Sequence, residues 1–132
     1  MIKFCILFKS KFLVKNFQNM KICMIGSGYV GLVSGACFSD LGNTVTCVDN
    51  NKEIIDKLNK GIIPIYEPGL QELVVRNIKK KRLFFSTDIS SSIKKSDIIF
   101  ICVGTPTKNN KADLKYVYNV VKSIKSNLNK YK

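Results

Sequence analysis

Residues 24–33, MIGSGYVGLV, place glycines at positions 26, 28 and 31 and decide the fold. A short apolar run, Lys21–Ile25, precedes them, and a segment of helical length and pattern, 29–41, follows them. In such a strand–turn–helix unit the first glycine permits the tight turn and the second leaves room for a pyrophosphate. The third lets the helix pack close to the strand. The stretch therefore predicts a dinucleotide-binding turn.

An acidic residue stands where this type of site needs one. The β-branched run Thr44–Val48 ends at Asp49, 18 residues after Gly31. A carboxylate at the end of the second strand accepts hydrogen bonds from the adenosine ribose hydroxyls and repels a 2′-phosphate. We therefore expect NAD rather than NADP, although Lys52 nearby works against that preference.

Two alternatives use the same pattern differently. A glycine-rich turn can be purely structural, without any cofactor. A methyltransferase that binds S-adenosylmethionine also has a glycine-rich first loop and an acid after its second strand. Its loop normally lacks the third glycine, and its ligand has no pyrophosphate, so dinucleotide binding is preferred.

The rest of the chain alternates strands and helices. Two further strands are expected at Leu83–Ser86 and 97–103, and further helices at Lys52–Asn59, 68–80, 88–95 and 112–127. Residues 104–110 are expected to form a loop. Alternation of this kind specifies an α/β fold, here a Rossmann-type doubly wound parallel sheet that is incomplete, with about four strands. We assign residues 20–132 to one truncated NAD-binding domain.

Residues 1–19 are basic and apolar, contain no acid and lack the long apolar centre of a signal peptide. An amphipathic helix with Phe4, Phe8 and Phe12 on one face is one interpretation. The preferred one is that the fold starts at Met20 and that residues 1–19 are an extension outside it. Because the next strand of a complete dinucleotide fold is missing, we expect the sheet edge beside 97–103 to be exposed, which favours aggregation.

Composition excludes several functions. The net charge of +13 comes almost entirely from lysine, with arginine only at 76 and 82, which argues against a nucleic-acid partner. No apolar run is long enough to span a membrane, so no membrane partner is expected. The chain has no histidine and its five cysteines form no C-x-x-C pair, so we expect no metal site and a cytoplasmic location.

Four segments together resemble the UDP-glucose 6-dehydrogenase family, and they occur in the order and at the spacing found in that family. They are MKICMIGSGYVGLVSGACFSDLGNTVTCVD from Met20, PIYEPGL from Pro64, IFICVGTP from Ile99, and ADL from Ala112. The resemblance covers residues 20 to about 125. It implies two successive NAD-dependent oxidations of the sugar 6-hydroxyl to a carboxylate, through a thiohemiacetal on a cysteine.

The resemblance also implies which residues bind NAD. In the phosphate loop they are Gly26, Ser27, Gly28, Tyr29, Val30 and Gly31, and at the ribose Asp49. Gly104 and Thr105 resemble the loop near the nicotinamide half. Many family members have a basic residue where this sequence has Ile54, so a contact to the adenosine side is expected to be lost or to move to Lys52. Glu67 is interpreted as part of a helix entrance.

The family's nucleophilic cysteine, in a G-x-G-G-x-C-x-x-K-D motif, has no counterpart here, and Cys37 is attributed to helix packing. We therefore assign no catalytic residue. We expect an NAD-binding fragment of a UDP-glucose 6-dehydrogenase that is inactive alone and meets UDP-glucose only when the missing domains are supplied. The alternatives are a free-standing nucleotide-binding module without catalysis, or a fragment of a related GDP-mannose or UDP-N-acetylmannosamine dehydrogenase.

Overall fold

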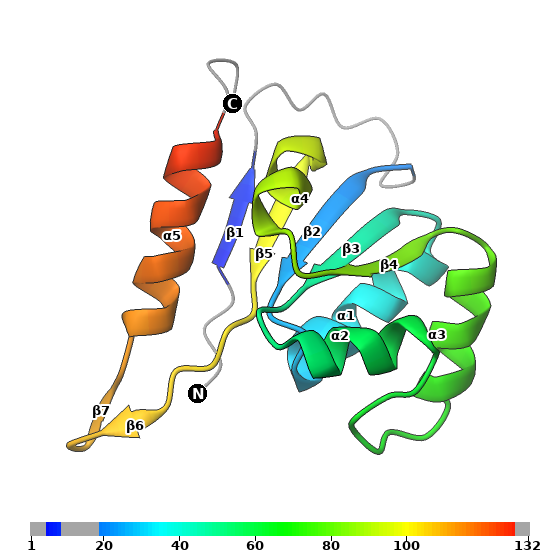
Figure 1. The fold of residues 1–132 in the computed structure, drawn as a ribbon, viewed down its shortest axis with the longest axis horizontal. Coiled ribbons are helices and arrows are strands. Elements are labelled where there is room, and N and C mark those ends of the chain that lie inside the picture. Colours follow the sequence, from blue (N-terminus) through cyan, green and yellow to red (C-terminus); the bar gives the residue numbers. More distant parts are fainter. Residues whose placement is uncertain (1–4, 9–18, 129–132) are drawn as a thin grey trace.

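The computed structural model describes residues 5–8 and 19–128. Its main sheet has five strands in the order β1-β5-β2-β3-β4, and β6 and β7 form a separate hairpin (Figure 1). In chain order the elements are β1 (Cys5–Phe8), β2 (Lys21–Ile25), α1 (Tyr29–Asp40), β3 (Thr44–Val48), α2 (Lys52–Asn59), α3 (Leu70–Lys79), β4 (Leu83–Ser86), α4 (Ile89–Lys95), β5 (Ile98–Ile101), β6 (Thr107–Lys108), β7 (Lys111–Ala112) and α5 (Lys115–Asn127).

The four predicted strands are parallel neighbours. The backbone of β2 pairs with β3 on one side and with β5 on the other, and β3 pairs with β4. The chain thus moves outward from β2 through β3 to β4 and then crosses back to β5. This reversal creates a topological switch point between β2 and β5, where open α/β sheets bind their ligands.

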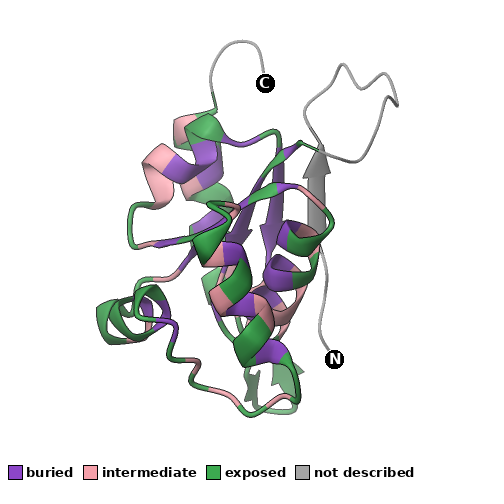
Figure 2. Ribbon diagram, turned by 90° about the vertical axis from the view of Figure 1, so that its right-hand side faces the viewer, coloured by how far each residue is buried: buried purple, intermediate pink, exposed green. Residues whose placement is uncertain are grey.

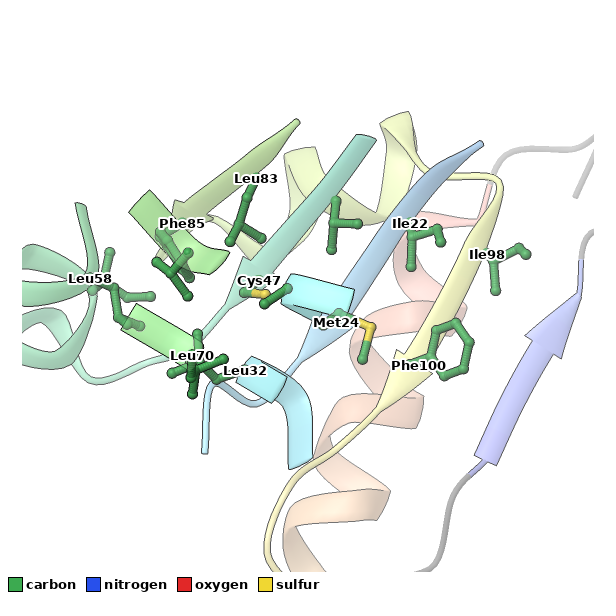
Figure 3. Close-up of a cluster of buried hydrophobic side chains, with 14 of the residues drawn as sticks. Ile22, Met24, Leu32, Cys47, Leu58, Leu70, Leu83, Phe85, Ile98 and Phe100 are labelled. Atoms are coloured by element: carbon green, nitrogen blue, oxygen red, sulfur yellow. The ribbon is translucent and has the colours of Figure 1, made fainter. Parts of the chain in front are cut away.

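Helices cover both faces of the sheet, which confirms the doubly wound α/β prediction. On one face α1, α2 and α3 cover a core that includes Met24, Leu32, Leu58 and Phe85 (Figure 3). Phe38 of α1 contacts Phe100 of β5 there, with ring centroids 5.1 Å apart. On the other face α4 and α5 contribute Ile93, Val120 and Ile124 to a smaller core.

Burial explains why the sequence of β5 lacks polar alternation. All four of its residues, Ile98–Ile101, are buried, since helices lie on both sides of the strand (Figure 2). Parallel strands enclosed in this way read as continuous apolar runs. Buried and exposed residues alternate along the helices, so one face of each packs against the sheet and the other faces solvent (Figure 2).

The N-terminal segment differs from its expectation. The backbone of β1 pairs antiparallel with β5, with Cys5 opposite Ile101 and Phe8 opposite Ile98. Four of the residues that we placed outside the fold therefore belong to the sheet and cover the edge that was expected to be exposed. A strand pairs with such an edge through its backbone N–H and C=O groups. Nearly every residue has these groups, so the sequence did not indicate the pairing. The alternative helix falls mainly on residues outside the described part.

Two local expectations also need correction. Residues 104–110 are not only loop, because β6 and β7 form a short hairpin whose turn residues, Asn109 and Asn110, have φ angles of 51° and 58°. Two left-handed residues make the tight hairpin turn that asparagine tolerates. This hairpin takes up residues 111 and 112, so α5 starts at Lys115 rather than 112. Within the described ranges, no helix has both the length and the apolar character to cross a bilayer.

Candidate functional site

A cleft of about 650 Å³ opens at the carboxyl ends of β2, β3 and β5. This is the switch point of the sheet, so the topology alone marks it as the place for a ligand. The part of α5 from Tyr116 to Ser123 forms a further wall. The lining residues are Ile25, Gly26, Gly28, Val48, Asp49, Asn50, Thr87, Ile89, Cys102, Val103, Gly104, Tyr116, Asn119, Val120 and Ser123.

Backbone crowding requires glycine at two positions of the turn between β2 and the first turn of α1. Gly26 has a φ of +105°, its N–H donates to the Val48 carbonyl at 2.7 Å, and a Cβ there would lie 2.7 Å from the Cys102 carbonyl oxygen. A Cβ on Gly31 would overlap the Gly26 carbonyl oxygen. The first turn of α1 therefore lies directly on the β2 turn, as the spacing predicts.

Gly28 has the opposite environment. No heavy atom lies within 4 Å of the position that a Cβ would take, and Gly28 itself lines the cleft. The first intrahelical hydrogen bond of α1 runs from the Leu32 N–H to the Gly28 carbonyl at 2.9 Å. The N–H groups of residues 29–31 thus have no helical acceptor, and no side chain caps this helix. The result is an open, positively polarised cradle that suits an anion.

Asp49 joins the end of β3 to the glycine turn. Its Oδ2 accepts a hydrogen bond from the Ser27 N–H at 2.8 Å, and its Oδ1 accepts one from the Asn51 N–H at 2.9 Å. A carboxylate has about four acceptor positions, so two remain for a ligand in the cleft. Asp49 therefore both fixes the loop and offers acceptors beside the cradle.

The nine predicted site residues do not all line the cleft. Gly26, Gly28, Asp49 and Gly104 do. The others, Ser27, Tyr29, Val30, Gly31 and Thr105, do not. Their roles as coenzyme contacts stay predictions.

Ser27 points inward. Its side chain is 1% exposed, and its hydroxyl has no hydrogen-bond partner among the residues that the structure describes. Its backbone N–H is already engaged by Asp49. Ser27 therefore supports the loop from below rather than presenting its hydroxyl to the cleft.

Sequence analysis missed one wall of the cleft. Thr87 and Ile89 come from the β4–α4 junction, and Tyr116, Asn119 and Ser123 lie at three- and four-residue spacing on α5. The general rule that ligands bind beyond the carboxyl ends of parallel strands would have indicated Thr87, which follows β4 directly. The sequence predicted the helix but did not indicate that it lines the cleft, because its position there depends on how α4 and α5 pack together.

Neither Lys52 nor Ile54 supplies the basic contact to the adenosine side that many family members have. Lys52 forms an ion pair with Asp56, with 2.7 Å between Nζ and Oδ2, so it lies along α2. Ile54 packs against the larger core, and its N–H is bound by the Asn51 side chain that caps α2. Neither residue lines the cleft.

None of the buried thiols is activated as a nucleophile. Burial raises the pKa of Cys23 to about 12, with a smaller contribution from Cys102, and burial raises the pKa of Cys102 to about 11. Burial also raises the pKa of Cys47. Thiols like these stay protonated at neutral pH. Cys37 is exposed on α1, so its assignment to helix packing was wrong.

A family model matches residues 20–132, nearly all of the described chain. Its description is "UDP-glucose/GDP-mannose dehydrogenase family, NAD binding domain". This chain belongs to that family. The resemblance noted from the four segments is thereby confirmed, and the coenzyme of this domain is NAD.

Curated relatives match only over this domain. UDP-glucose 6-dehydrogenase TuaD of Bacillus subtilis is 54% identical over 113 residues, which is 85% of this chain and 24% of the relative. UDP-glucose 6-dehydrogenase of Rhizobium meliloti is 51% identical over 83% of this chain and 25% of the relative. The chain thus spans about a quarter of the length of these UDP-glucose/GDP-mannose dehydrogenase relatives.

Solved structures agree on the fold. A GDP-mannose dehydrogenase from Pseudomonas aeruginosa, determined as a ternary complex, superimposes with a TM-score of 0.81 at 40% identity, over 84% of this chain and 26% of that one. A UDP-glucose dehydrogenase from Pyrobaculum islandicum gives a TM-score of 0.78 at 33% identity, covering 86% of this chain and 27% of that one.

The residues of the cleft fit the coenzyme of the family. Space is kept free where a side chain on Gly28 would stand, next to N–H groups that lack acceptors. A diphosphate needs that combination of room and donors. The Asp49 carboxylate lies at the end of the neighbouring strand, where a ribose needs acceptors.

Proposed function

We propose that this chain is the coenzyme-binding part of a UDP-glucose 6-dehydrogenase. The observation that carries the proposal is the open cradle at Gly28 beside the Asp49 carboxylate, in a chain 54% identical to a UDP-glucose 6-dehydrogenase over this domain. The UDP-glucose 6-dehydrogenases of Bacillus subtilis and Rhizobium meliloti, at 54% and 51% identity, are more similar in sequence than the GDP-mannose dehydrogenase of known structure, at 40%. UDP-glucose is therefore the preferred substrate.

Each part of the cleft has a defined task in this function. The N–H groups at the start of α1 hold the diphosphate, and Asp49 orients the adenosine ribose through its remaining lone pairs. Gly104 lies three residues after the end of β5, across the switch point, where the nicotinamide half is accommodated. The coenzyme, when bound, accepts hydride from the substrate. The protein contributes position and orientation.

Asp49→Asn tests the ribose assignment. We expect the dissociation constant for NAD to rise about tenfold, because one charged acceptor becomes a neutral amide. Binding of NADP should weaken less, since the negative charge that repels its 2′-phosphate is gone. Calorimetry with both coenzymes gives the ratio of the two dissociation constants. A general loosening of the loop would weaken NAD and NADP equally and leave this ratio unchanged.

Asp56→Asn is the matched control. It removes the same charge from an exposed position on α2 that does not line the cleft. Its NAD and NADP affinities should equal those of the parent chain. An unchanged NAD-to-NADP preference in Asp49→Asn would show that this carboxylate does not bind the ribose hydroxyls.

The catalytic proposal is tested with a hybrid protein. Residues 20–132 would replace the matching quarter of the Bacillus subtilis relative, and NADH formation from UDP-glucose would be followed by absorbance. We expect the hybrid to be active and chain 1–132 alone to be inactive, because burial keeps the thiols of Cys23, Cys47 and Cys102 protonated and the sequence has no histidine. An inactive but folded hybrid, or NADH production by the chain alone, would contradict the proposal.

We also place the protein in the cytoplasm. The four cysteines whose side chains the structure describes, at 23, 37, 47 and 102, are free thiols, and three of them are at least partly buried. Proteins of oxidising compartments more often use such residues in disulfides.

A further inference from the structure

One hydrogen bond connects the start of α1 to a distant loop. The phenol of Tyr29, the first residue of α1, donates to Oε2 of Glu67 at 2.8 Å. Glu67 lies 38 residues later, in the connection between α2 and α3. Its interpretation as a helix entrance needs correction, because α3 begins at Leu70 with Gly69 as its N-cap. The side chain of Glu67 is instead engaged with the glycine turn.

The other end of α1 is held in a similar way. Asp40, its last residue, accepts hydrogen bonds from Arg76 at 3.0 Å and from the Asn77 amide at 3.2 Å, both on α3. Between these ends α1 packs on the sheet through Leu32 and Ala36. Polar contacts to α3 and to the loop before it thus fix both ends of the helix, while apolar contacts fix its middle.

The Tyr29 end is the one that matters for a ligand. Tyr29 lies directly after Gly28, in the turn whose N–H groups have no helical acceptor. No side-chain cap and no acidic residue stabilise this first turn, so frayed conformations compete with the helical one. A frayed turn would scatter the donors that a diphosphate must meet together.

We propose that Glu67 is a positioning residue for NAD: by holding Tyr29, it keeps the first turn of α1 in the conformation that binds the diphosphate. The inference rests on the proposed placement of NAD in this cleft. Glu67 does not line the cleft, so its effect is indirect. Loss of Glu67 should therefore weaken the binding of ligands that carry a diphosphate and leave the binding of adenosine unchanged.

The state of the phenol provides a spectroscopic signature of the contact. The hydrogen bond to Glu67, followed by the negative charge of that residue, raises the pKa of Tyr29 above its ordinary value. The phenol therefore keeps its proton at neutral pH and loses it when the pH rises through that raised pKa. In Glu67→Gln the pKa of Tyr29 should fall toward the ordinary value near 10.

The experiment compares Tyr29→Phe, Glu67→Gln and the double variant in chain 1–132. NAD, ADP and adenosine are the ligands, measured by calorimetry or by competition. We expect each single variant to weaken NAD and ADP about fivefold, the scale of one exposed hydrogen bond to a charged group, and to leave adenosine unchanged. The double variant should be no weaker than Tyr29→Phe, because both substitutions remove the same contact.

Tyr66→Phe is the matched control. Tyr66 is adjacent to Glu67 and 92% exposed, so loss of its hydroxyl should change none of these affinities. Equal effects of Tyr29→Phe on adenosine and ADP, or additive single effects, would overturn the proposal. If the parent chain itself fails to bind NAD, the proposed function fails. Amide exchange then decides: the Leu32 amide, which donates the first hydrogen bond of α1, must exchange faster in Tyr29→Phe than in Tyr66→Phe for the positioning role to stand.

Discussion

The variant Gly31→Ala should be less stable than the parent chain by about 3 kcal/mol, which lowers the thermal midpoint by roughly 12 °C. The added methyl group would overlap the backbone carbonyl oxygen of Gly26 and come within 3.3 Å of the Cys102 Cβ. Backbone atoms at the end of β2 cannot rotate away as a flexible side chain would. The helix therefore has to shift, at a cost that exceeds the gain of about 1 kcal/mol from alanine's higher helix propensity.

Gly104→Ala provides the stability control. No heavy atom lies within 4 Å of its Cβ position, so its free energy of unfolding should match that of the parent chain within about 0.5 kcal/mol. Scanning calorimetry or denaturant titration measures both variants. If Gly31→Ala proves as stable as Gly104→Ala, α1 is not packed against the β2 turn as described.

Gly28→Val should keep the fold and lose the coenzyme. The backbone of Gly28, with φ −72° and ψ −167°, is one that valine adopts readily, and its side chain would enter free space. That space is the cradle where the diphosphate meets the N–H groups of α1. Loss of two such charge-assisted hydrogen bonds predicts at least a hundredfold weaker binding of NAD, while stability changes by less than about 1 kcal/mol.

Gly28→Ala grades the effect. Its single methyl group fills less of the cradle, so its NAD affinity should fall between those of the parent and Gly28→Val. In a melting experiment NAD should raise the thermal midpoint of the parent chain but not that of Gly28→Val. Coenzyme affinity that is equal in all three proteins would mean that the diphosphate binds elsewhere.

The first βα unit was predictable because its constraints are local. Gly26 and Gly31 are required by contacts within a few residues or with the neighbouring strand, and the spacing of the glycines encodes those contacts. Asp49 follows from the same unit, since it ends the strand beside β2. The continuous apolar run around Ile98–Ile101 likewise revealed a strand covered on both faces, as burial of all four residues confirms.

Tertiary structure decided the features that join distant segments. The cleft wall from Thr87 and α5, the antiparallel pairing of Cys5–Phe8 with β5 and the contact of Tyr29 with Glu67 leave no periodic trace in the sequence. Each depends on where whole helices and strands come to rest after the core has formed. Hydrophobic patterns specify which residues are buried, but many polar and backbone contacts at the surface are compatible with the same pattern. The sequence by itself therefore determined the glycine turn, its acid and the class of sheet, whereas only the packed fold determined what surrounds the coenzyme cleft and what holds its first turn.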